Sequence, residues 1–298
     1  MKSRLRVLVV LGLVLLASSA LSQERKPPRP NPPAPNPAPA PSPTPAPSNG
    51  AKLLFASEFD SEDELKTAAH LWRTGWPLGA GVTSPATPGE VEIYVDYQKG
   101  DKWGQNPFKV SNSVLSITAT PTPGLPKPFT YTSGCLSTAG IFSFQYGYAE
   151  MRGQAPKGSG FWPTFWMMPW KGDWSKVVWP PEIDIYQASS RINNQNYPAV
   201  LSGTSKKVIE AGEFITAKSD LSAAMHTYGF EWTETTMTWY LDGAVVMTKP
   251  SPAGTAMRMY LMLSLAVGDN GTWIGKPDGS TQSWLIDYVR VYDRKPSK

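Results

Sequence analysis

The chain has 298 residues, of which 41% are hydrophobic, and it carries a formal net charge of +4. Residues 1–50 hold six basic residues and one acidic residue, so residues 51–298 have a net charge of −1. The basic character lies in the first fifty residues, which excludes a strongly basic nucleic-acid-binding domain. The single cysteine, Cys135, excludes an intrachain disulfide.

The first residues are typical of a secretory signal peptide. Residues 1–6 are basic, and residues 7–17 form an apolar stretch that is short for a bilayer span. Small residues follow, and we expect cleavage to remove residues 1–22. The protein would then be secreted, periplasmic or held in the cell envelope, with no membrane-embedded part. An uncleaved membrane anchor is the alternative.

Residues 23–50 are rich in proline and alanine. Such a segment is extended and semi-rigid, and it has no means of packing a core. Its composition predicts a spacer. A ligand for an SH3-type domain is the alternative, which is unfavourable because an exported protein would rarely meet such a partner. The folded domain is therefore expected over residues 51–298.

Most of the predicted domain has the alternating or β-branched pattern of strands. One helix is expected over residues 61–70, where Ser61 and Glu64 fit a capping box. Residues 236–248 predict a hairpin whose tight turn is Asp242-Gly243. Further strands are expected at 90–95, 113–120, 146–155, 257–268 and 283–293. Many short strands separated by turn residues indicate an all-β sandwich or barrel.

Two carboxylates stand out in the segment 179–190, which otherwise has the composition of a buried strand. Glu182 and Asp184 are two residues apart, so they point to the same face. Like charges on one face repel each other, which indicates chemistry rather than stability. A glycoside-cleaving site would need a further carboxylic acid slightly along this face, and the sequence offers Tyr186 and Gln187 there.

Tryptophans cluster just before these carboxylates. Indole rings stack on the apolar faces of pyranose sugars, but aromatic rings also dominate hydrophobic cores. The candidates for a sugar platform are Trp162, Trp166, Trp179 and Trp273. Trp162 and Trp179 are the preferred pair because of their position before Glu182, and a place in the core is the alternative for about half of the tryptophans.

Five segments resemble, in the same order, signatures of glycoside hydrolase family 16. They are residues 131–169, 179–187, 226–246, 261–280 and 286–293. The resemblance implies a β-jelly-roll in which two antiparallel sheets stack and the concave inner sheet forms a glycan-binding cleft. It also implies a monomeric hydrolase of a β-linked polysaccharide, such as a β-glucan or an exopolysaccharide, that requires no cofactor.

The family motif is Glu-x-Asp-x-Glu, or Glu-x-Asp-x-x-Glu where a β-bulge inserts one residue. The resemblance implies that Glu182 is the nucleophile of a retaining mechanism and that Asp184 supports it. The last Glu is the acid and base, and its position falls on Gln187 in the bulged register or on Tyr186 in the unbulged one. Glutamine cannot hand over a proton at neutral pH, and a tyrosine, with a pKa of about 10, is a reluctant acid.

Two functions remain open. The first is a hydrolase whose proton donation is impaired at Gln187. The second is a carbohydrate-binding protein that keeps the fold and the cleft but has lost the chemistry. Glu210 and Glu213 are carboxylates within reach of the cleft, although a solvated strand edge is the preferred interpretation for both.

The family resemblance also implies that a structural calcium ion is possible. Residues 57–60 and Asp287 resemble elements that bind calcium on the convex side in many relatives. An ordinary surface carboxylate is the alternative for Asp287, because calcium also requires backbone carbonyl ligands that a sequence does not reveal. With two histidines in the chain, a histidine-based metal site is not expected.

Overall fold

The computed structural model describes residues 49–66, 70–76, 89–100, 103, 105–172, 178–268 and 274–297. These residues belong to one compact unit, Ala38–Lys298. The predicted signal peptide, nearly all of the predicted spacer and Trp273 lie outside the described residues. No helix in the described part is long and apolar enough to cross a membrane.

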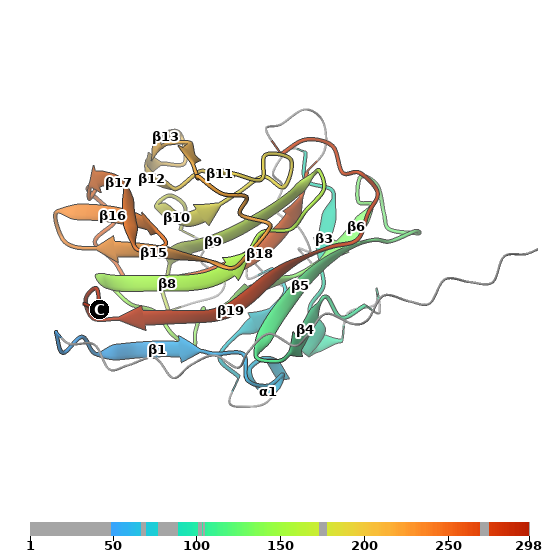
Figure 1. Cartoon of the computed structure of the whole chain (residues 1–298), viewed down its shortest axis with the longest axis horizontal. Helices are drawn as coiled ribbons and strands as arrows, with labels where there is room; N and C mark the ends of the chain where they lie inside the picture. Colours follow the sequence, from blue (N-terminus) through green and yellow to red (C-terminus); the bar gives the residue numbers. More distant parts are fainter. Residues whose placement is uncertain are drawn as a thin grey trace, which may run out of the picture. The chain divides into compact units, whose positions relative to one another are not determined.

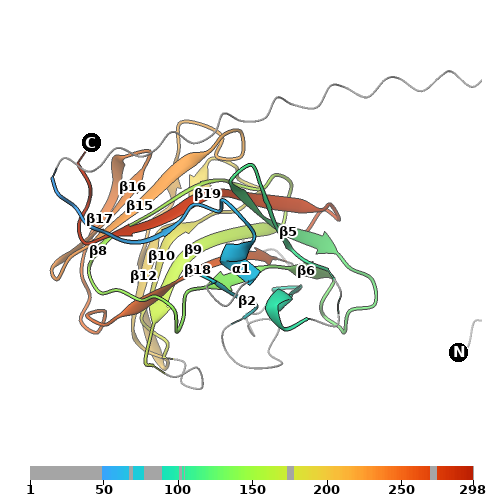
Figure 2. The ribbon, with the colours of Figure 1, turned by 90° about the horizontal axis from the view of Figure 1, so that it is seen from below.

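Within the described residues, two large sheets stack on each other (Figures 1 and 2). The ten-stranded sheet has the order β17 (Ala244–Pro250), β16 (Thr236–Leu241), β15 (His226–Trp232), β8 (Gly147–Gln154), β19 (Gln282–Tyr292), β5 (Val114–Pro121), β6 (Tyr131–Ser133) and β3 (Glu92–Tyr94). Its two remaining strands pair off this path, β1 (Leu53–Ser57) with β19 and β4 (Phe108–Ser111) with β5. All of these pairings are antiparallel except that of β3 with β6.

The seven-stranded sheet is antiparallel throughout and carries the candidate site. Its order is β13 (Lys207–Gly212), β12 (Ala199–Thr204), β10 (Glu182–Gln187), β9 (Phe161–Pro169), β18 (Met259–Val267), β7 (Cys135–Ser137) and β2 (Arg73–Thr74). The smaller elements are the strand pair β11 (Gln195–Asn196) and β14 (Ile215–Thr216), the helix α1 (Asp63–Lys66) and the 3₁₀ turn η1 (Tyr97–Lys99).

This architecture confirms the predicted all-β fold class with stacked antiparallel sheets. The predicted hairpin is also confirmed: Asp242 and Gly243 have φ values of 50° and 80°, as a tight turn between β16 and β17 requires. The predicted capping box is only half formed, because Ser61 Oγ accepts from the backbone N–H of Asp63 (3.2 Å) at the start of α1, but Glu64 does not complete the box. The Glu64 carboxylate accepts hydrogen bonds from the Asp60 backbone N–H (3.1 Å) and from the Ser57 hydroxyl instead of reaching back to Ser61.

Alternation along β9 and β18 separates the core from the cleft. Phe161, Phe165 and Met167 of β9 are fully buried and belong to the main core between the two sheets. Burying side chains of this size contributes about 1.5–3 kcal/mol each. The alternate residues of β9 point to the opposite face of the seven-stranded sheet. Cys135 is free and lies fully buried in a second apolar cluster with Trp166, on that opposite face.

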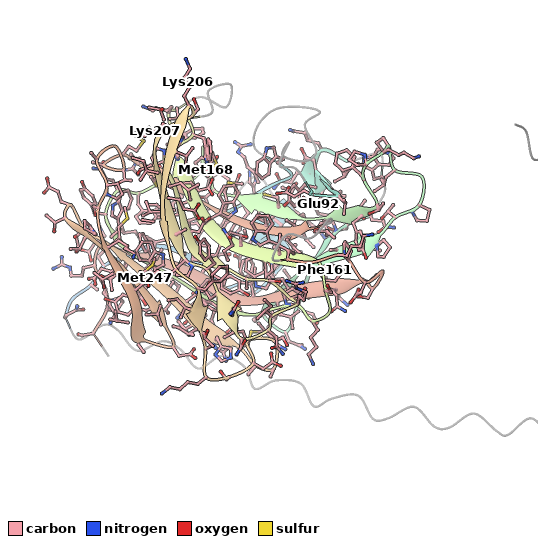
Figure 3. The ribbon with its side chains drawn as sticks, turned by 90° about the horizontal axis from the view of Figure 1, so that it is seen from above. Glu92, Phe161, Met168, Lys206, Lys207 and Met247 are labelled. Carbon is pink, nitrogen blue, oxygen red and sulfur yellow. The ribbon has the colours of Figure 1, made fainter. Side chains whose placement is uncertain are left out.

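The strands β12 and β13 form a hairpin at the edge of the seven-stranded sheet. Figure 3 shows Lys206 and Lys207 at its tip, standing clear of the neighbouring strands. Four residues in a row, from Lys207 to Glu210, are exposed. This hairpin therefore borders the cleft without being covered by the rest of the domain.

Candidate active-site cleft

A cleft lies over β9, β10 and β18, on the face of the seven-stranded sheet that points away from the core. Its floor comes from alternate residues of these strands, which face the same way because strand side chains alternate. The described lining consists of Trp76, Glu90, Tyr94, Trp162, Thr164, Trp166, Met168, Trp179, Glu182, Asp184, Gln187, Ser264 and Ala266. Aromatic rings and carboxylates thus dominate this surface.

A β-bulge in β10 decides which residues reach the cleft. The pairing of β10 with β9 shifts register between Asp184 and Tyr186. Two successive residues, Ile185 and Tyr186, both lie in the main core. Gln187 consequently returns to the cleft face, beside Glu182 and Asp184 in the lining. Of the two registers considered from the sequence, the structure has the bulged one.

Hydrogen bonds fix the bulge on both sides. The Trp239 indole N–H donates to the backbone carbonyl of Asp184 at 2.9 Å, from the opposite sheet. The backbone N–H of Gln187 donates to Asn196 Oδ1 (3.0 Å), and its carbonyl accepts from the backbone N–H of Tyr197 (2.7 Å). The orientation of Gln187 is therefore set by its neighbours.

Tyr186, the unbulged alternative for the acid position, points into the core. Its ring is fully buried, with its centroid 4.1 Å from that of Tyr228 and 5.9 Å from that of Trp284. Burial raises the pKa of the Tyr186 hydroxyl above its ordinary value. Tyr186 is therefore wrong as a candidate proton donor in the cleft.

The two cleft carboxylates are held in an environment that disfavours their ionisation. Burial raises the pKa of Glu182 to about 7, and the charge of Glu210 adds to the shift, while the hydrogen bond from the Trp179 indole N–H (2.8 Å to Oε2) opposes it. Burial also raises the pKa of Asp184 well above its usual range, helped by the charges of Glu182 and Glu210 and opposed by a hydrogen bond from Gln187.

These shifts limit the charge that the cleft carries near neutral pH. Glu182 and Asp184 lie on one face, and two buried carboxylates placed in this way do not both ionise readily. Asp184 retains its proton to the higher pH, because its burial is complete and Glu182 lies beside it. As the pH rises, Glu182 therefore ionises before Asp184.

One end of the cleft is a set of aromatic rings. Trp76 stacks on Tyr94, with centroids 5.7 Å apart and an interplanar angle of 12°, and lies 5.9 Å from Trp166. Trp166 is largely buried, and its N–H donates to Ser264 Oγ at 3.1 Å. The Trp76 N–H is buried and has no hydrogen-bond partner among the described residues. The Trp76 ring, rather than this N–H, contributes to the lining of the cleft.

The structure places three of the four predicted platform tryptophans in the cleft. Trp162 and Trp166 project from β9, and Trp179 stands at the start of β10 with 40% of its surface exposed. Trp166 is chiefly a floor residue because it is packed in the second apolar cluster. Trp273 lies outside the described residues. The contribution of these rings to glycan binding stays a prediction.

Glu210 is exposed on the edge strand β13, as the preferred interpretation from the sequence expects, and it also faces the cleft side of the sheet. Cross-strand pairing aligns Glu182 with Leu201 and Leu201 with Glu210, which puts Glu210 on the cleft face two strands from Glu182. Its charge acts on both cleft carboxylates. The position of Glu210 on the cleft face follows from the strand-pairing register, which the sequence alone does not reveal. Glu213 is likewise exposed and forms an ion pair with Lys249, as expected of a strand edge.

The carboxylates considered for calcium have arginine partners. Asp287 Oδ2 accepts a hydrogen bond from Arg152 at 2.5 Å. Both oxygens of Glu58 accept from the Arg290 guanidinium at 2.7 Å. The described residues contain no group of three or more His, Cys, Asp or Glu side chains that could hold a metal ion. The structure shows what these carboxylates contact, and the calcium site considered for Asp287 stays a prediction.

Comparisons of sequence and of structure with known proteins lead to the same family. The model of the family "Glycosyl hydrolases family 16" matches residues 96–290. The chain is similar to the solved laminarinase catalytic domain of Thermotoga maritima MSB8, with a TM-score of 0.66 and 26% identity, covering 83% of this chain and 99% of that one.

Curated relatives include both enzymes and a binding protein. The chain is 32% identical over 250 residues to Endo-1,3-1,4-beta-glycanase ExsH of Rhizobium meliloti (strain 1021), covering 80% of this chain and 51% of that protein. It is 25% identical over 192 residues to Beta-1,3-glucan-binding protein of Penaeus monodon, covering 51% and 50%. The chain spans about half the length of both proteins.

Proposed function

The chain belongs to glycosyl hydrolase family 16, and from this membership we propose that it acts on a β-linked polysaccharide such as a β-glucan, through a retaining mechanism with impaired proton donation. One observation carries the proposal. The bulged strand β10 brings Glu182, Asp184 and Gln187 to the same face of an aromatic cleft. A retaining mechanism needs a nucleophile and an acid only about 5 Å apart.

In this mechanism the ionised Glu182 attacks the anomeric carbon and forms a glycosyl–enzyme ester. The bond to the glycosidic oxygen breaks, its electron pair stays on that oxygen, and the oxygen takes a proton from solvent water. Asp184 favours the reaction by keeping its own proton, so that the negative charge of the pair resides on Glu182. Water then hydrolyses the ester and regenerates the Glu182 carboxylate.

The leaving oxygen needs a proton that Gln187 cannot supply. The amide donates a hydrogen bond but keeps its hydrogen at neutral pH. A positioned general acid accelerates such a step by about 100- to 10,000-fold. Attack on an unactivated polysaccharide should be slower by that factor, while glycan binding should persist because glutamine is nearly isosteric with glutamate.

A second candidate function is glycan binding without turnover. The amide at position 187, held on the cleft face by the bulge, favours it. The similarity to a protein named for β-1,3-glucan binding gives it further support. In either function, we propose that residues 1–22 direct export and that residues 23–50 act as a spacer that separates the domain from its anchor or partner.

The two functions are separated by one paired experiment. A glycan-array binding screen is run beside a reducing-sugar assay on the same polysaccharides, with Glu182→Gln as the control for contaminating activity. Product formed by the unmodified protein and absent from Glu182→Gln supports the hydrolase. Binding without product selects the binding protein. Neither binding nor product on any β-linked polysaccharide would contradict both.

A further inference from the structure

We propose that Tyr197, Glu210 and Phe214 form a second sugar-binding subsite, which takes a further pyranose unit of the glycan at the end of the cleft opposite Trp76. The proposal rests on the function proposed above and extends it. These residues lie beyond the cleft lining described above, at the hairpin of β12 and β13.

The floor of this subsite is the Tyr197 ring. A Cβ atom placed on Gly212 would lie 2.8 Å from Cζ of Tyr197 and 3.0 Å from the Cβ of Ala199, so the ring covers both residues. Ala199 pairs directly with Asp184 across the strands, which puts both on the same face. The Tyr197 ring therefore lies on the cleft face, next to the carboxylates of β10.

The polar group of the subsite is the Glu210 carboxylate. Its Oε1 accepts a hydrogen bond from the Tyr197 hydroxyl at 2.8 Å, which fixes the carboxylate over the edge of the ring. Glu210 is exposed, and its pairing register puts it on the cleft side of the sheet. A carboxylate held in this way accepts hydrogen bonds from neighbouring sugar hydroxyls, and these charge-assisted bonds are stronger than neutral ones.

The apolar wall of the subsite is Phe214. Its ring centroid is 4.6 Å from that of Tyr197 at an interplanar angle of 47°, and 53% of its surface is exposed. A single exposed aromatic ring on a protein surface is ordinary. Here the ring is angled against a second aromatic ring, with a carboxylate beside it. That combination offers a pyranose both an apolar face and a hydroxyl acceptor.

The subsite is continuous with the catalytic carboxylates. Glu182, Leu201 and Glu210 occupy neighbouring strands in register. Adjacent strands are about 4.8 Å apart, so Glu210 lies about 10 Å across the sheet from Glu182. A glycan bound across the strands would run from Trp76 past Glu182 toward Tyr197 and Phe214. A short oligosaccharide that occupies only the sites beside Glu182 would not reach these two rings, whereas a longer one would. Affinity should therefore depend on chain length.

Calorimetry with β-1,3-linked and mixed-linkage gluco-oligosaccharides of increasing length tests this, in a Glu182→Gln background that prevents turnover. Phe214→Ala should weaken binding of the longest oligosaccharides by about tenfold, as expected for one lost ring stack, and leave the shortest unchanged. Phe214→Tyr should retain affinity. Val245→Ala removes an apolar side chain that is 60% exposed on β17 of the other sheet, and it should change nothing.

The outcomes separate this subsite from the function on which it rests. If the parent protein binds long oligosaccharides and Phe214→Ala has no effect, or weakens all lengths equally, the subsite is wrong and the proposed function stands. If the parent binds none of them and no polysaccharide on the array, the proposed function and the subsite are both wrong.

Discussion

Glu150 and Glu58 have surroundings opposite to those of the cleft carboxylates Glu182 and Asp184. On β8 of the ten-stranded sheet, Glu150 accepts hydrogen bonds from Tyr148 and Tyr288, both at 2.8 Å, and Glu58, directly after β1, accepts from Nε and Nη2 of Arg290. In the cleft, Glu182 and Asp184 lie beside each other, and the donors that the structure gives them, Trp179 and Gln187, are neutral.

This difference distinguishes carboxylates that stabilise the fold from carboxylates kept for chemistry. A charged partner or several donors offset the cost of burying a carboxylate, whereas a second carboxylate adds to it. The cleft pair therefore costs folding free energy, as reactive groups commonly do.

The largest expected effect is the restoration of the missing acid. Gln187→Glu should raise hydrolysis of the cognate β-glycan by about 100-fold or more, because a carboxylic acid would then stand on the same face as Glu182. Repulsion among three carboxyl groups would also keep the new acid protonated near neutral pH. Reducing-sugar release measures the change.

Gln187→Asn is the matched control for this prediction, because it changes the side chain without adding an acid. Robust polysaccharide cleavage by the unmodified protein, unimproved by Gln187→Glu, would falsify the assignment of position 187. Glu210 would then be the first alternative donor to examine, because it is the further carboxylate whose charge acts on the pair.

The second prediction concerns the pH dependence of turnover. An activated aryl glycoside needs no proton for its leaving group, so kcat/KM of the unmodified protein should follow ionisation of Glu182 near neutral pH. It should fall about tenfold per pH unit below pH 7 and level off above it, until Asp184 loses its own proton at a higher pH. With polysaccharide substrates, Gln187→Glu should add a decline that begins nearer neutral pH. For the unmodified protein, a decline that begins near neutral pH would indicate an unrecognised acid.

The third prediction concerns the stability of the fold. Removing a buried polar group usually lowers the free energy of unfolding, but here removing the Glu182 carboxylate should raise it. The pKa of Glu182 is raised from 4.5 to about 7 in the folded protein, so the unfolded chain loses this proton first as the pH rises. The contribution of Glu182 to the stability of the fold is therefore greatest below pH 4.5 and is lost as the pH rises through about 7. Glu182→Gln should raise the free energy of unfolding by about 1–3 kcal/mol at pH 8 and leave it nearly unchanged at pH 4.5.

Denaturant unfolding of both proteins at the two pH values measures this difference, and a trapped glycosyl–Glu182 adduct seen by mass spectrometry would identify the same residue independently. A Glu182→Gln protein that is less stable at pH 8 would mean that Glu182 is a structural group like Glu58.

The fourth prediction separates the sugar platform from the core. Trp179→Ala should weaken glycan binding by about 1–3 kcal/mol with little change in stability, because the ring is 40% exposed. Trp162→Ala should weaken binding by a similar amount. Trp166→Ala is the contrasting variant, since it should chiefly destabilise the fold by opening a cavity. If Trp179→Ala and Trp162→Ala leave affinity unchanged while destabilising the fold, both residues are core.

Much of this architecture was predictable from local patterns. The strands β5, β8, β18 and β19 and the turn at Asp242-Gly243 follow from alternation and turn residues, because both signals are local. The order of the strands in each sheet is not local, and neither is the position of Glu210. The bulge at residues 184–186 was one of two alternatives, since hydrophobic pattern alone does not count an inserted residue.

The last prediction, with the smallest expected effect, tests whether Glu58 stabilises the fold. Glu58→Gln should destabilise the protein by about 1–2 kcal/mol, because it leaves the Arg290 guanidinium with a neutral partner in place of a bidentate carboxylate. The Arg290 side chain is only 12% exposed and lies over the Tyr288 ring at 3.9 Å, so water replaces the lost partner poorly. Glycan affinity should not change, because Glu58 follows β1 of the other sheet.

Glu213→Gln is the control variant. It removes the partner of Lys249 from a more exposed ion pair and should lower the free energy of unfolding by less than about 0.5 kcal/mol. Equal losses in denaturant unfolding for the two variants would mean that the arginine fork adds nothing beyond an ordinary surface pair, and the contrast between the two sheets would then rest on the cleft alone.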